Sequence, residues 1–567
     1  MTPQTHLTPE THLTPETHLI PRLIAGASAE SGVRFLGSAG AGGDERLTWE
    51  QIPHDARVVA HRLQAAGIGR GTHVAILGPT TRALVTTVQG IWLSGATAVL
   101  LPLPMRLASI EAFVEQTRVR ITNADVHHLI IDGALAPFAP VVEGVTPIVL
   151  DDLVASPTSQ DADRWVQPVL DDNDMAVLQF TSGSTADPKG VMVLHRTLLA
   201  NLDGATAAAG VTSDDVVCHW LPLYHDMGFI GLTTIPMVSG IELAIAPPQD
   251  FLAAPARWME WMSQTRATIT AGPNFAWALA TRAFARAENL DLSNIQIALS
   301  GAEPVDPTTI ARFCDAALPF GFDPSAFFPA FGMAETMIAA NFPPRGRGLA
   351  VDEVDSAQLE HARTAVPSAG AGGSSTRSLA RLGKPIPGME MRIVCPETGA
   401  VLEERCVGEL ELRGTSVTPG YYKNEVATRE RFHDGWLRTG DLGYIAHGEL
   451  VVCGRLKDMI IVGGRNVFPE DIERAAGAVG GVRTGNVIAF GSTARSGREN
   501  IVVVAETRAV DIDLVREEVK TSVLGAVGLP PHDVVLVEPG TLPKTSSGKL
   551  QRSLAKEQWG RDELSRV

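Results

Sequence analysis

The chain has 567 residues, of which 45% are hydrophobic and 20% are charged, with a formal net charge of −17. This composition is typical of a globular protein, and the length predicts more than one domain because a single hydrophobic core rarely grows past about 300 residues. The acidic balance argues against nucleic acid as a general partner, and no apolar run reaches the roughly 18 residues that stable membrane insertion requires.

The five cysteines are scattered through the chain and form no Cys-x-x-Cys pair. This spacing argues against a zinc site or a disulfide framework and favours reduced thiols. We therefore expect a cytoplasmic protein.

The N-terminus opens on a repeat: Thr-His-Leu-Thr-Pro-Glu stands at residues 5–10, recurs at residues 11–16 and restarts at Thr17. A secretory signal would need a basic start and a continuous apolar stretch, and neither is present. A metal site would need ligands besides three histidines spaced six residues apart. We predict a mobile tail over residues 1–22, with no assigned role.

Beyond the tail, short apolar runs alternate with segments of helical length. Thr48 and Gln51 stand at capping-box spacing and predict the start of a helix. Strands separated by helical lengths predict an α/β fold of parallel or mixed sheets flanked by helices, with ligands at the carboxyl ends of the strands. The predicted buried strands cover residues 73–77, 98–101, 128–131, 175–180, 241–245 and 295–299.

The most informative stretch follows the predicted strand 175–180. Five consecutive Thr, Ser and Gly residues can bring backbone and hydroxyl donors close to an anion, and a lysine nearby adds a mobile positive charge. This chemistry suits a polyphosphate, although Pro188 excludes a Walker A loop and a polar surface loop is the alternative for this run alone. The predicted phosphate-binding residues are Thr181, Ser182, Gly183, Ser184, Thr185 and Lys189.

Four later motifs, together with this loop, resemble the adenylate-forming enzyme superfamily in order and spacing. The motifs are Phe331–Thr336, Arg438–Asp441, Gly454–Asp458 and Pro543–Lys549, and the resemblance covers roughly residues 45 to 555. It implies activation of a carboxylate with ATP and Mg²⁺, giving an acyl-AMP and pyrophosphate. It also implies a large adenylation domain over residues 23–456 and a small, mobile α+β lid over residues 457–567, with lid strands at residues 486–490 and 501–505.

The resemblance implies roles for individual residues. The carboxylate and the α-phosphate are both anionic, so the site must supply positive charge, and Lys549 resembles the catalytic lysine of the family. Glu335 resembles the Mg²⁺ ligand, and a single carboxylate is adequate beside phosphate oxygens. Asp441 and Arg455 resemble the pair that holds the ribose hydroxyls. The residues that resemble the remaining nucleotide pocket are Gly301, Ala302, Glu303, Phe331, Gly332, Met333 and Thr336.

Within the superfamily, four segments resemble the fatty acyl-AMP ligases: Leu221–Gly231, Gly272–Trp277, Gly301–Val305 and Lys457–Glu473. These enzymes pass a fatty acyl-adenylate to the phosphopantetheine thiol of an acyl carrier protein, or of a carrier domain, in lipid, polyketide or lipopeptide synthesis. The resemblance therefore implies a fatty or related aliphatic acid as substrate and a carrier protein as partner.

Three further assignments depend on this branch. His225 corresponds to a gate between the acyl and nucleotide pockets, with a structural role as the alternative; an acid–base dyad with Asp226 is unnecessary because the attacking carboxylate is already ionised. Phe229, Phe275 and Trp277 are expected to line the acyl pocket, although Trp277 could equally belong to the core.

Lys457 resembles the hinge between the two domains, and residues 337–381 are long enough for the insertion that distinguishes these ligases from acyl-CoA synthetases. The glycine-rich stretch 368–375 within it predicts a flexible segment. An acyl-CoA synthetase that uses free CoA and a catalytically silent binding protein remain the alternatives.

Overall fold

The computed structural model describes residues 18–37, 44–104, 110–181, 188–368, 376–463, 465–493, 499–545 and 548–567. The repeats at residues 5–16 lie outside these residues. The predicted tail, however, extends too far: helix α1 (Leu19–Ala25) belongs to the fold, because Leu19 and Ile20 are both fully buried.

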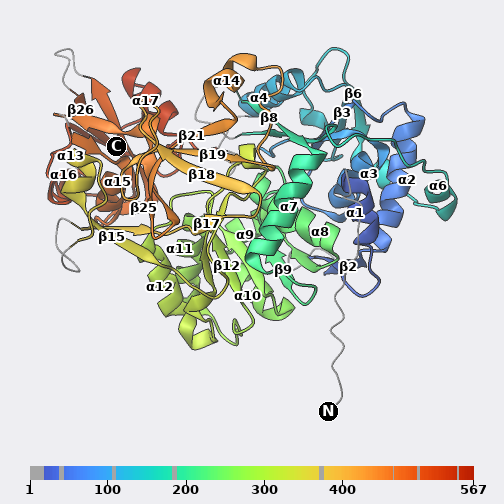
Figure 1. Cartoon of the computed structure of the whole chain (residues 1–567), viewed down its shortest axis with the longest axis horizontal. Helices are drawn as coiled ribbons and strands as arrows, with labels where there is room; N and C mark the ends of the chain where they lie inside the picture. The colour runs from blue at the N-terminus through green and yellow to red at the C-terminus, as the bar shows by residue number, and fades with distance from the viewer. Residues whose placement is uncertain are drawn as a thin grey trace.

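Two large sheets, flanked by helices, occupy the first 330 residues or so (Figure 1). One has the order β13-β12-β11-β9-β10-β1-β2, parallel except at β2, and the other has the order β6-β5-β3-β4-β7-β8, parallel except at β8. The first contains β1 (Gly32–Phe35), β2 (Glu45–Thr48), β9 (Val216–His219), β10 (Glu242–Ile245), β11 (Ile269–Gly272), β12 (Ile297–Ser300) and β13 (Phe327–Pro329). The second contains β3 (His73–Leu77), β4 (Thr97–Leu100), β5 (His128–Ile131), β6 (Thr146–Val149), β7 (Met175–Phe180) and β8 (Gly190–Leu194).

The α/β architecture predicted from the sequence is therefore confirmed. Each predicted strand overlaps an observed one, and helix α2 (Gln51–Ala65) begins where the capping box places it. The backbone N–H of Thr48 donates to Gln51 Oε1 at 3.0 Å, and that of Gln51 donates to Thr48 Oγ1 at 3.2 Å. The other principal helices here are α3 (Arg82–Ser94), α4 (Ile110–Asn123), α5 (Leu150–Val154), α6 (Ser159–Asp163), α7 (His195–Ala209), the π-helical η2 (Met227–Thr234), α8 (Ile235–Ser239), α9 (Pro248–Ala253), α10 (Ala256–Thr265), α11 (Asn274–Ala283) and α12 (Pro307–Ala317).

A third, antiparallel sheet follows, and a smaller α+β unit completes the chain. The third sheet contains β18 (Met389–Val394), β19 (Gly408–Gly414), β20 (Phe432–His433), β21 (Trp436–Ala446) and β22 (Glu449–Arg455), with α14 (Glu425–Arg431) beside it. The C-terminal unit, called the lid below, contains β23 (Ile460–Val462), β24 (Arg465–Val467), α15 (Pro469–Gly477), β25 (Val482–Thr493), β26 (Glu499–Thr507), α16 (Ile512–Val527), β27 (Asp533–Val537) and α17 (Arg552–Gly560). The lid has a hydrophobic cluster of its own, formed by valines of β26 and α16 with residues of β24 and β27.

The described residues of the segment 337–381 form packed structure around a pair of antiparallel strands. Strands β15 (Val351–Asp355) and β16 (Thr376–Ala380) pair antiparallel, and α13 (Ser356–Ala362) lies between them in sequence. Val354 and Leu359 are buried in a cluster that also contains Tyr444 and Phe468. This segment is therefore part of a core, and the glycine-rich stretch from residue 369 to residue 375 lies outside the described residues.

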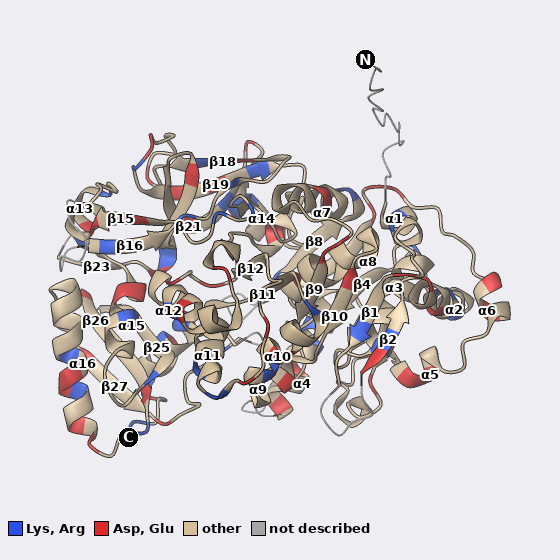
Figure 2. Cartoon of the chain, turned by 90° about the horizontal axis from the view of Figure 1, so that it is seen from below, with Lys and Arg blue, Asp and Glu red and all other residues tan. Residues whose placement is uncertain are grey.

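Charged residues lie mainly on the outer elements, such as α5, α6 and α16, whereas β11 and β12 carry none (Figure 2). Within the part of the chain that the structure describes, no helix is both long and apolar enough to cross a bilayer.

Two buried histidines predict a loss of stability in acid. Burial lowers the pKa of His195 to about 4 and that of His219 to about 3. Because an unfolded histidine titrates near pH 6.5, the stability that these neutral rings contribute is fully present above that pH and is lost as the pH falls. At pH 5 each of the two histidines should lower the free energy of unfolding by about 2 kcal/mol relative to its value at pH 7.5. Urea unfolding at the two pH values measures the sum, and His195→Gln, which cannot take up a proton, should remove about half of it.

Candidate active site

A cavity of about 2060 Å³ lies between the large domain and the lid. Its walls come from the residues that follow β7, β12 and β13, from the ends of β21 and β22, and from the lid segment around Lys549. The strands β7, β12 and β13 present their carboxyl ends to it, as the general rule for ligand sites in such sheets requires.

The residues predicted to form the nucleotide pocket come together at this edge of the sheet. Gly301, Ala302 and Glu303 follow β12, Phe331 and Gly332 follow β13, and all of them line the cavity together with Met333. A Cβ atom on Gly332 would lie 1.6 Å from the carbonyl oxygen of Ile338, so only glycine fits between the two loops. At the end of β12, the buried Ser300 Oγ has no hydrogen-bond partner within the described structure.

The phosphate loop is described at its two ends. The backbone N–H of Thr181 donates to the carbonyl of Lys189 at 3.1 Å, which closes the base of the loop. The ammonium of Lys189 lies 5.2 Å from the centroid of the Tyr421 ring, and both residues line the cavity. The predicted residues Ser182, Gly183, Ser184 and Thr185 lie outside the described residues.

Glu335 is held in place by groups that the sequence analysis missed. It lies in the short helix η6 (Ala334–Thr336), is 6% exposed, and lines the cavity. The hydroxyl of Tyr421 donates to Glu335 Oε1 at 2.6 Å, and the backbone N–H of Thr418 donates to the Glu335 carbonyl at 2.8 Å. Burial and the Glu335 carboxylate raise the pKa of Tyr421 far above its ordinary value, so its hydroxyl remains a donor.

This carboxylate fits the requirement for Mg²⁺. The described residues contain no group of three or more His, Cys, Asp or Glu side chains that could hold a metal alone. Mg²⁺ commonly takes one or two carboxylates and fills its other positions with phosphate oxygens and water. Glu335 would therefore hold the ion only together with a bound polyphosphate. The sequence contained a signal for Tyr421, the hydrogen-bond partner of Glu335. The chain has only four tyrosines, and two of them stand side by side after Thr-Pro-Gly.

Asp441 and Arg455 face each other across two paired strands. They are register partners on β21 and β22, and Arg455 Nε lies 3.0 Å from Asp441 Oδ1. Burial raises the pKa of Asp441, while the adjacent guanidinium of Arg455 opposes that rise. A buried carboxylate of fixed orientation at the rim of the cavity is suited to accept two hydroxyl donors, which is the geometry of a ribose site.

Lys549 reaches from the lid into the large domain. Its Nζ lies 3.4 Å from His225 Nε2, and His225 Nδ1 lies 2.6 Å from Asp226 Oδ1. The backbone N–H of Met227 also lies 3.3 Å from Nδ1; in the tautomer in which Nδ1 carries the proton shared with Asp226, the Nε2 lone pair accepts from the Lys549 ammonium. Burial lowers the pKa of Lys549, and the carboxylates of Asp226 and Glu303 raise it. The arrangement brings a positive charge from the lid into the cavity.

The Lys549 segment is tied to the junction between the domains. Lys457 is exposed and lies in η7 (Leu456–Asp458), between β22 and β23. Arg552, three residues after Lys549, donates to Asp458 Oδ2 at 2.5 Å and to Glu473 Oε1 at 2.8 Å. The sequence analysis did not single out Arg552, and its role depends entirely on a contact across 94 residues.

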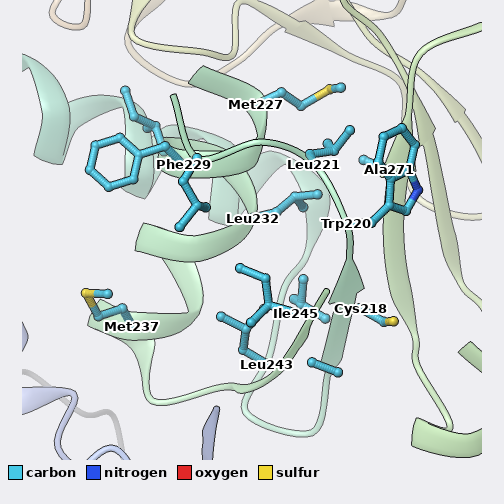
Figure 3. Close-up of a cluster of buried hydrophobic side chains, with 14 of the residues drawn as sticks. Cys218, Trp220, Leu221, Met227, Phe229, Leu232, Met237, Leu243, Ile245 and Ala271 are labelled. Atoms are coloured by element: carbon cyan, nitrogen blue, oxygen red, sulfur yellow. The ribbon is translucent and has the colours of Figure 1, made fainter. Parts of the chain in front are cut away.

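The three predicted acyl-pocket residues divide. Phe275 lines the cavity, whereas Phe229 and Trp277 are 1% and 0% exposed and do not, so the prediction is wrong for Phe229 and the core alternative holds for Trp277. Phe229 stacks on Trp92 at 5.5 Å, and Figure 3 shows its ring directed away from Ala271. Trp277 packs against Trp258 at 4.5 Å and donates its indole N–H to the Gly272 carbonyl at 2.9 Å. On both helices, η2 and α11, residues of the opposite face line the cavity, so the rings of Phe229 and Trp277 face the core.

Comparison with known proteins identifies the family of this chain. Residues 29–422 match the AMP-binding enzyme family. A Mycobacterium tuberculosis protein named as a ligase, Rv1013, is 39% identical over 90% of this chain and 94% of its own length. The medium-chain-fatty-acid–[acyl-carrier-protein] ligase JamA of Moorena producens is 32% identical over 89% of this chain and 88% of its own. Other relatives are named as fatty-acid–CoA ligases.

A solved structure from a study of fatty acyl-adenylate ligases of E. coli and L. pneumophila superposes with a TM-score of 0.89. The two chains are 28% identical, and the match covers 96% of this chain and 98% of the other. The superposition extends the likeness beyond the family match to the C-terminal lid. The chain therefore belongs to the AMP-binding enzyme family and is an adenylate-forming acid–AMP ligase with a C-terminal lid domain.

Proposed function

We propose that this enzyme activates a fatty or related aliphatic acid as its acyl-AMP and passes the acyl group to the phosphopantetheine thiol of an acyl carrier protein. The observation that carries the proposal is one cavity whose lining includes Asp441, Glu335 and Lys549 together with an apolar wall. The names of JamA and of the fatty acyl-adenylate ligases support a fatty acid and a carrier protein.

In the first half-reaction, a carboxylate oxygen attacks the α-phosphorus of ATP, and the bond to pyrophosphate breaks. Lys549 is positioned to neutralise charge on both reacting groups, and His225, anchored by Asp226, keeps the ammonium in place. Asp441 and Arg455 would hold the ribose, and the pocket from Gly301 to Glu303 and from Phe331 to Met333, with Thr336 behind it, would hold the base. Mg²⁺, when bound at Glu335, supplies countercharge to the phosphates.

In the second half-reaction, the thiol sulfur attacks the acyl carbon, and the bond to AMP breaks. Lys549 belongs to the lid and reaches into the cavity beside His225, so we expect the lid to move before a thiol can reach the acyl carbon. We assign the movement to Lys457 and place the domain boundary at residue 456, with residues 337–381 as the family insertion.

The contacts of this insertion with the lid support a carrier protein over free CoA. Arg465 in β24 donates to Glu360 Oε2 of α13 at 2.6 Å, and Asn466 donates to the Glu360 carbonyl at 2.9 Å. Arg377 in β16 lies 3.0 Å from Asp471 of α15 and 4.2 Å from the centroid of the Phe468 ring. These contacts disfavour rotation of the lid, and a carrier protein can offset their loss through contacts of its own.

Product analysis tests the proposal. Purified enzyme with ATP, Mg²⁺ and a mixture of saturated fatty acids should form acyl-AMP and pyrophosphate. It should then transfer the acyl group to a phosphopantetheinylated carrier protein faster than to CoA. If acyl-CoA forms as fast as the carrier-bound thioester, the enzyme is an acyl-CoA synthetase instead.

Arg465→Ala should raise acyl-CoA formation while adenylation changes little. Excising the insertion would remove Val354 and Leu359 from a core, so a single contact is the sharper test. A coupling of only about 1.4 kcal/mol between insertion and lid corresponds to a tenfold change in CoA turnover. Arg516→Ala is the matched control, because its ion pair with Asp513 lies within the same lid, on α16. Equal CoA turnover in both variants would contradict the proposal that contacts between the insertion and the lid disfavour rotation of the lid.

A further inference from the structure

The apolar end of the cavity runs down one face of a sheet. Alternate residues of a strand share a face, and the cavity is lined by Leu299 and Ile297 of β12 and by Ala271 and Ile269 of β11. The register pairs Ala271 with Leu299, and Ile269 with both Ile297 and Val217 of β9. The face therefore has two rows, and the second row (Val217, Ile269 and Ile297) lies at the amino ends of the strands, farthest from the nucleotide pocket.

Small residues form the opposite wall. Ala205 and Ala209 stand four positions apart on α7, on one face of that helix, and both line the cavity together with Leu232 and Ile235. Val211, just beyond the end of α7, completes the deep end. We call Val211, Val217, Ile269 and Ile297 the floor.

Behind the floor lies an arginine that ties its segments together. Arg345 makes a two-pronged ion pair with Asp215, at 2.7 and 3.2 Å, and donates to the Gly210 carbonyl and to Gln296 Oε1, both at 2.7 Å. Gly210 precedes Val211, and Gln296 precedes Ile297. Asp215 also accepts a hydrogen bond from Thr268 Oγ1 at 2.7 Å, and Thr268 precedes Ile269.

One guanidinium thus connects every segment that supplies a floor residue. The Asp215 side chain is 3% exposed and that of Arg345 is 22% exposed, so the pair is largely shielded from water. Removing one partner of such a pair leaves an unpaired buried charge, which the segments can relieve only by separating or by admitting water. The position of the floor depends on the pair staying closed.

We infer that Arg345, clamped on Asp215, closes the far end of the acyl channel and sets the longest acid that the enzyme activates. This inference rests on the proposed function, since it assigns the channel to the acyl chain. From Ile297 to Gly301 the strand and its continuation advance four residues, or about 13 Å at about 3.3 Å per residue. A zigzag of C–C bonds of about 1.5 Å covers that distance with on the order of ten carbons, so the substrate class is medium-chain acids.

The test is the chain-length profile of acid-dependent ATP–pyrophosphate exchange, measured with saturated acids of about 6 to 18 carbons. Arg345→Met keeps a side chain of similar length but removes the clamp, and it should raise the ratio of kcat/KM for the longest to the shortest acids at least about tenfold. Ala209→Leu, which places a larger side chain at the deep end, should shift the profile toward shorter acids.

Arg392→Ala is the matched control, because its ion pair with Glu411 has nearly the same geometry, 2.6 Å with side chains 25% and 1% exposed, and lies in the third sheet, away from the channel. Should Arg345→Met not fold, Asp215→Asn removes the charge with little change of shape and is expected to shift the profile in the same direction. If the wild-type enzyme is active and the chain-length profiles of Arg345→Met and Asp215→Asn do not change, this inference is wrong while the proposed function stands. Absence of exchange with every acid in the wild type would instead overturn the proposed function.

Discussion

Lys549→Ala should slow formation of the acyl-AMP by about 10²–10³-fold or more, a loss of roughly 3–4 kcal/mol of transition-state stabilisation, by analogy with removed oxyanion donors. The reason is that Lys549 supplies a positive charge inside the cavity, beside His225 and close to the carboxylates of Asp226 and Glu303. Binding of ATP should survive, because the predicted base, ribose and metal contacts come from the large domain. Carboxylate-dependent ATP–pyrophosphate exchange measures the loss, and titration with ATP measures binding.

Lys520→Ala provides the control for this experiment. Lys520 lies on α16 in the same lid and pairs with Glu517 on the surface, so its removal changes the net charge equally without touching the cavity. If Lys549→Ala catalysed exchange at a rate close to that of the control, Lys549 would have no role in adenylation.

Lys457→Pro should leave adenylation largely intact and abolish transfer to the thiol. Proline fixes φ near −65°, and in the first turn of a short helix such as η7 its missing N–H is tolerated, so the arrangement seen here should persist. Swinging the lid away requires a change of backbone angle at this junction, which proline prevents. Single-turnover measurements that follow acyl-AMP and thioester separately should show the adenylate accumulating.

Lys457→Ala is the matched variant, because it removes the same side chain and leaves φ free. It should transfer the acyl group at a rate near that of the wild type. If the proline variant lost both half-reactions equally, the block would lie in folding or in the site itself, and the hinge would have to be placed elsewhere.

Local patterns were sufficient for much of the fold. The capping box at Thr48 and Gln51 fixed the start of α2, and apolar runs bounded by turn residues located β3, β5 and β7 to the residue. The predicted end of the tail at residue 22 was wrong, because Leu19 and Ile20 in the third repeat pack into a core that the local sequence pattern does not reveal. The acyl-pocket prediction was wrong for Phe229 for the same reason: a position next to a motif does not say which face of a helix meets the cavity. For Trp277, the local pattern left the choice between pocket and core open.

By itself, the sequence determined the class of chemistry, since the order and spacing of Lys189, Glu335, Asp441 and Lys549 point to one reaction. Only the tertiary structure decided what holds these groups and where the substrate ends. The Tyr421 hydroxyl on Glu335, the Arg552 contact with Asp458 and the Arg345 clamp on Asp215 join residues 86, 94 and 130 positions apart. Such contacts form when the packing of whole sheets and helices brings distant segments together, and no local pattern of residues records that packing.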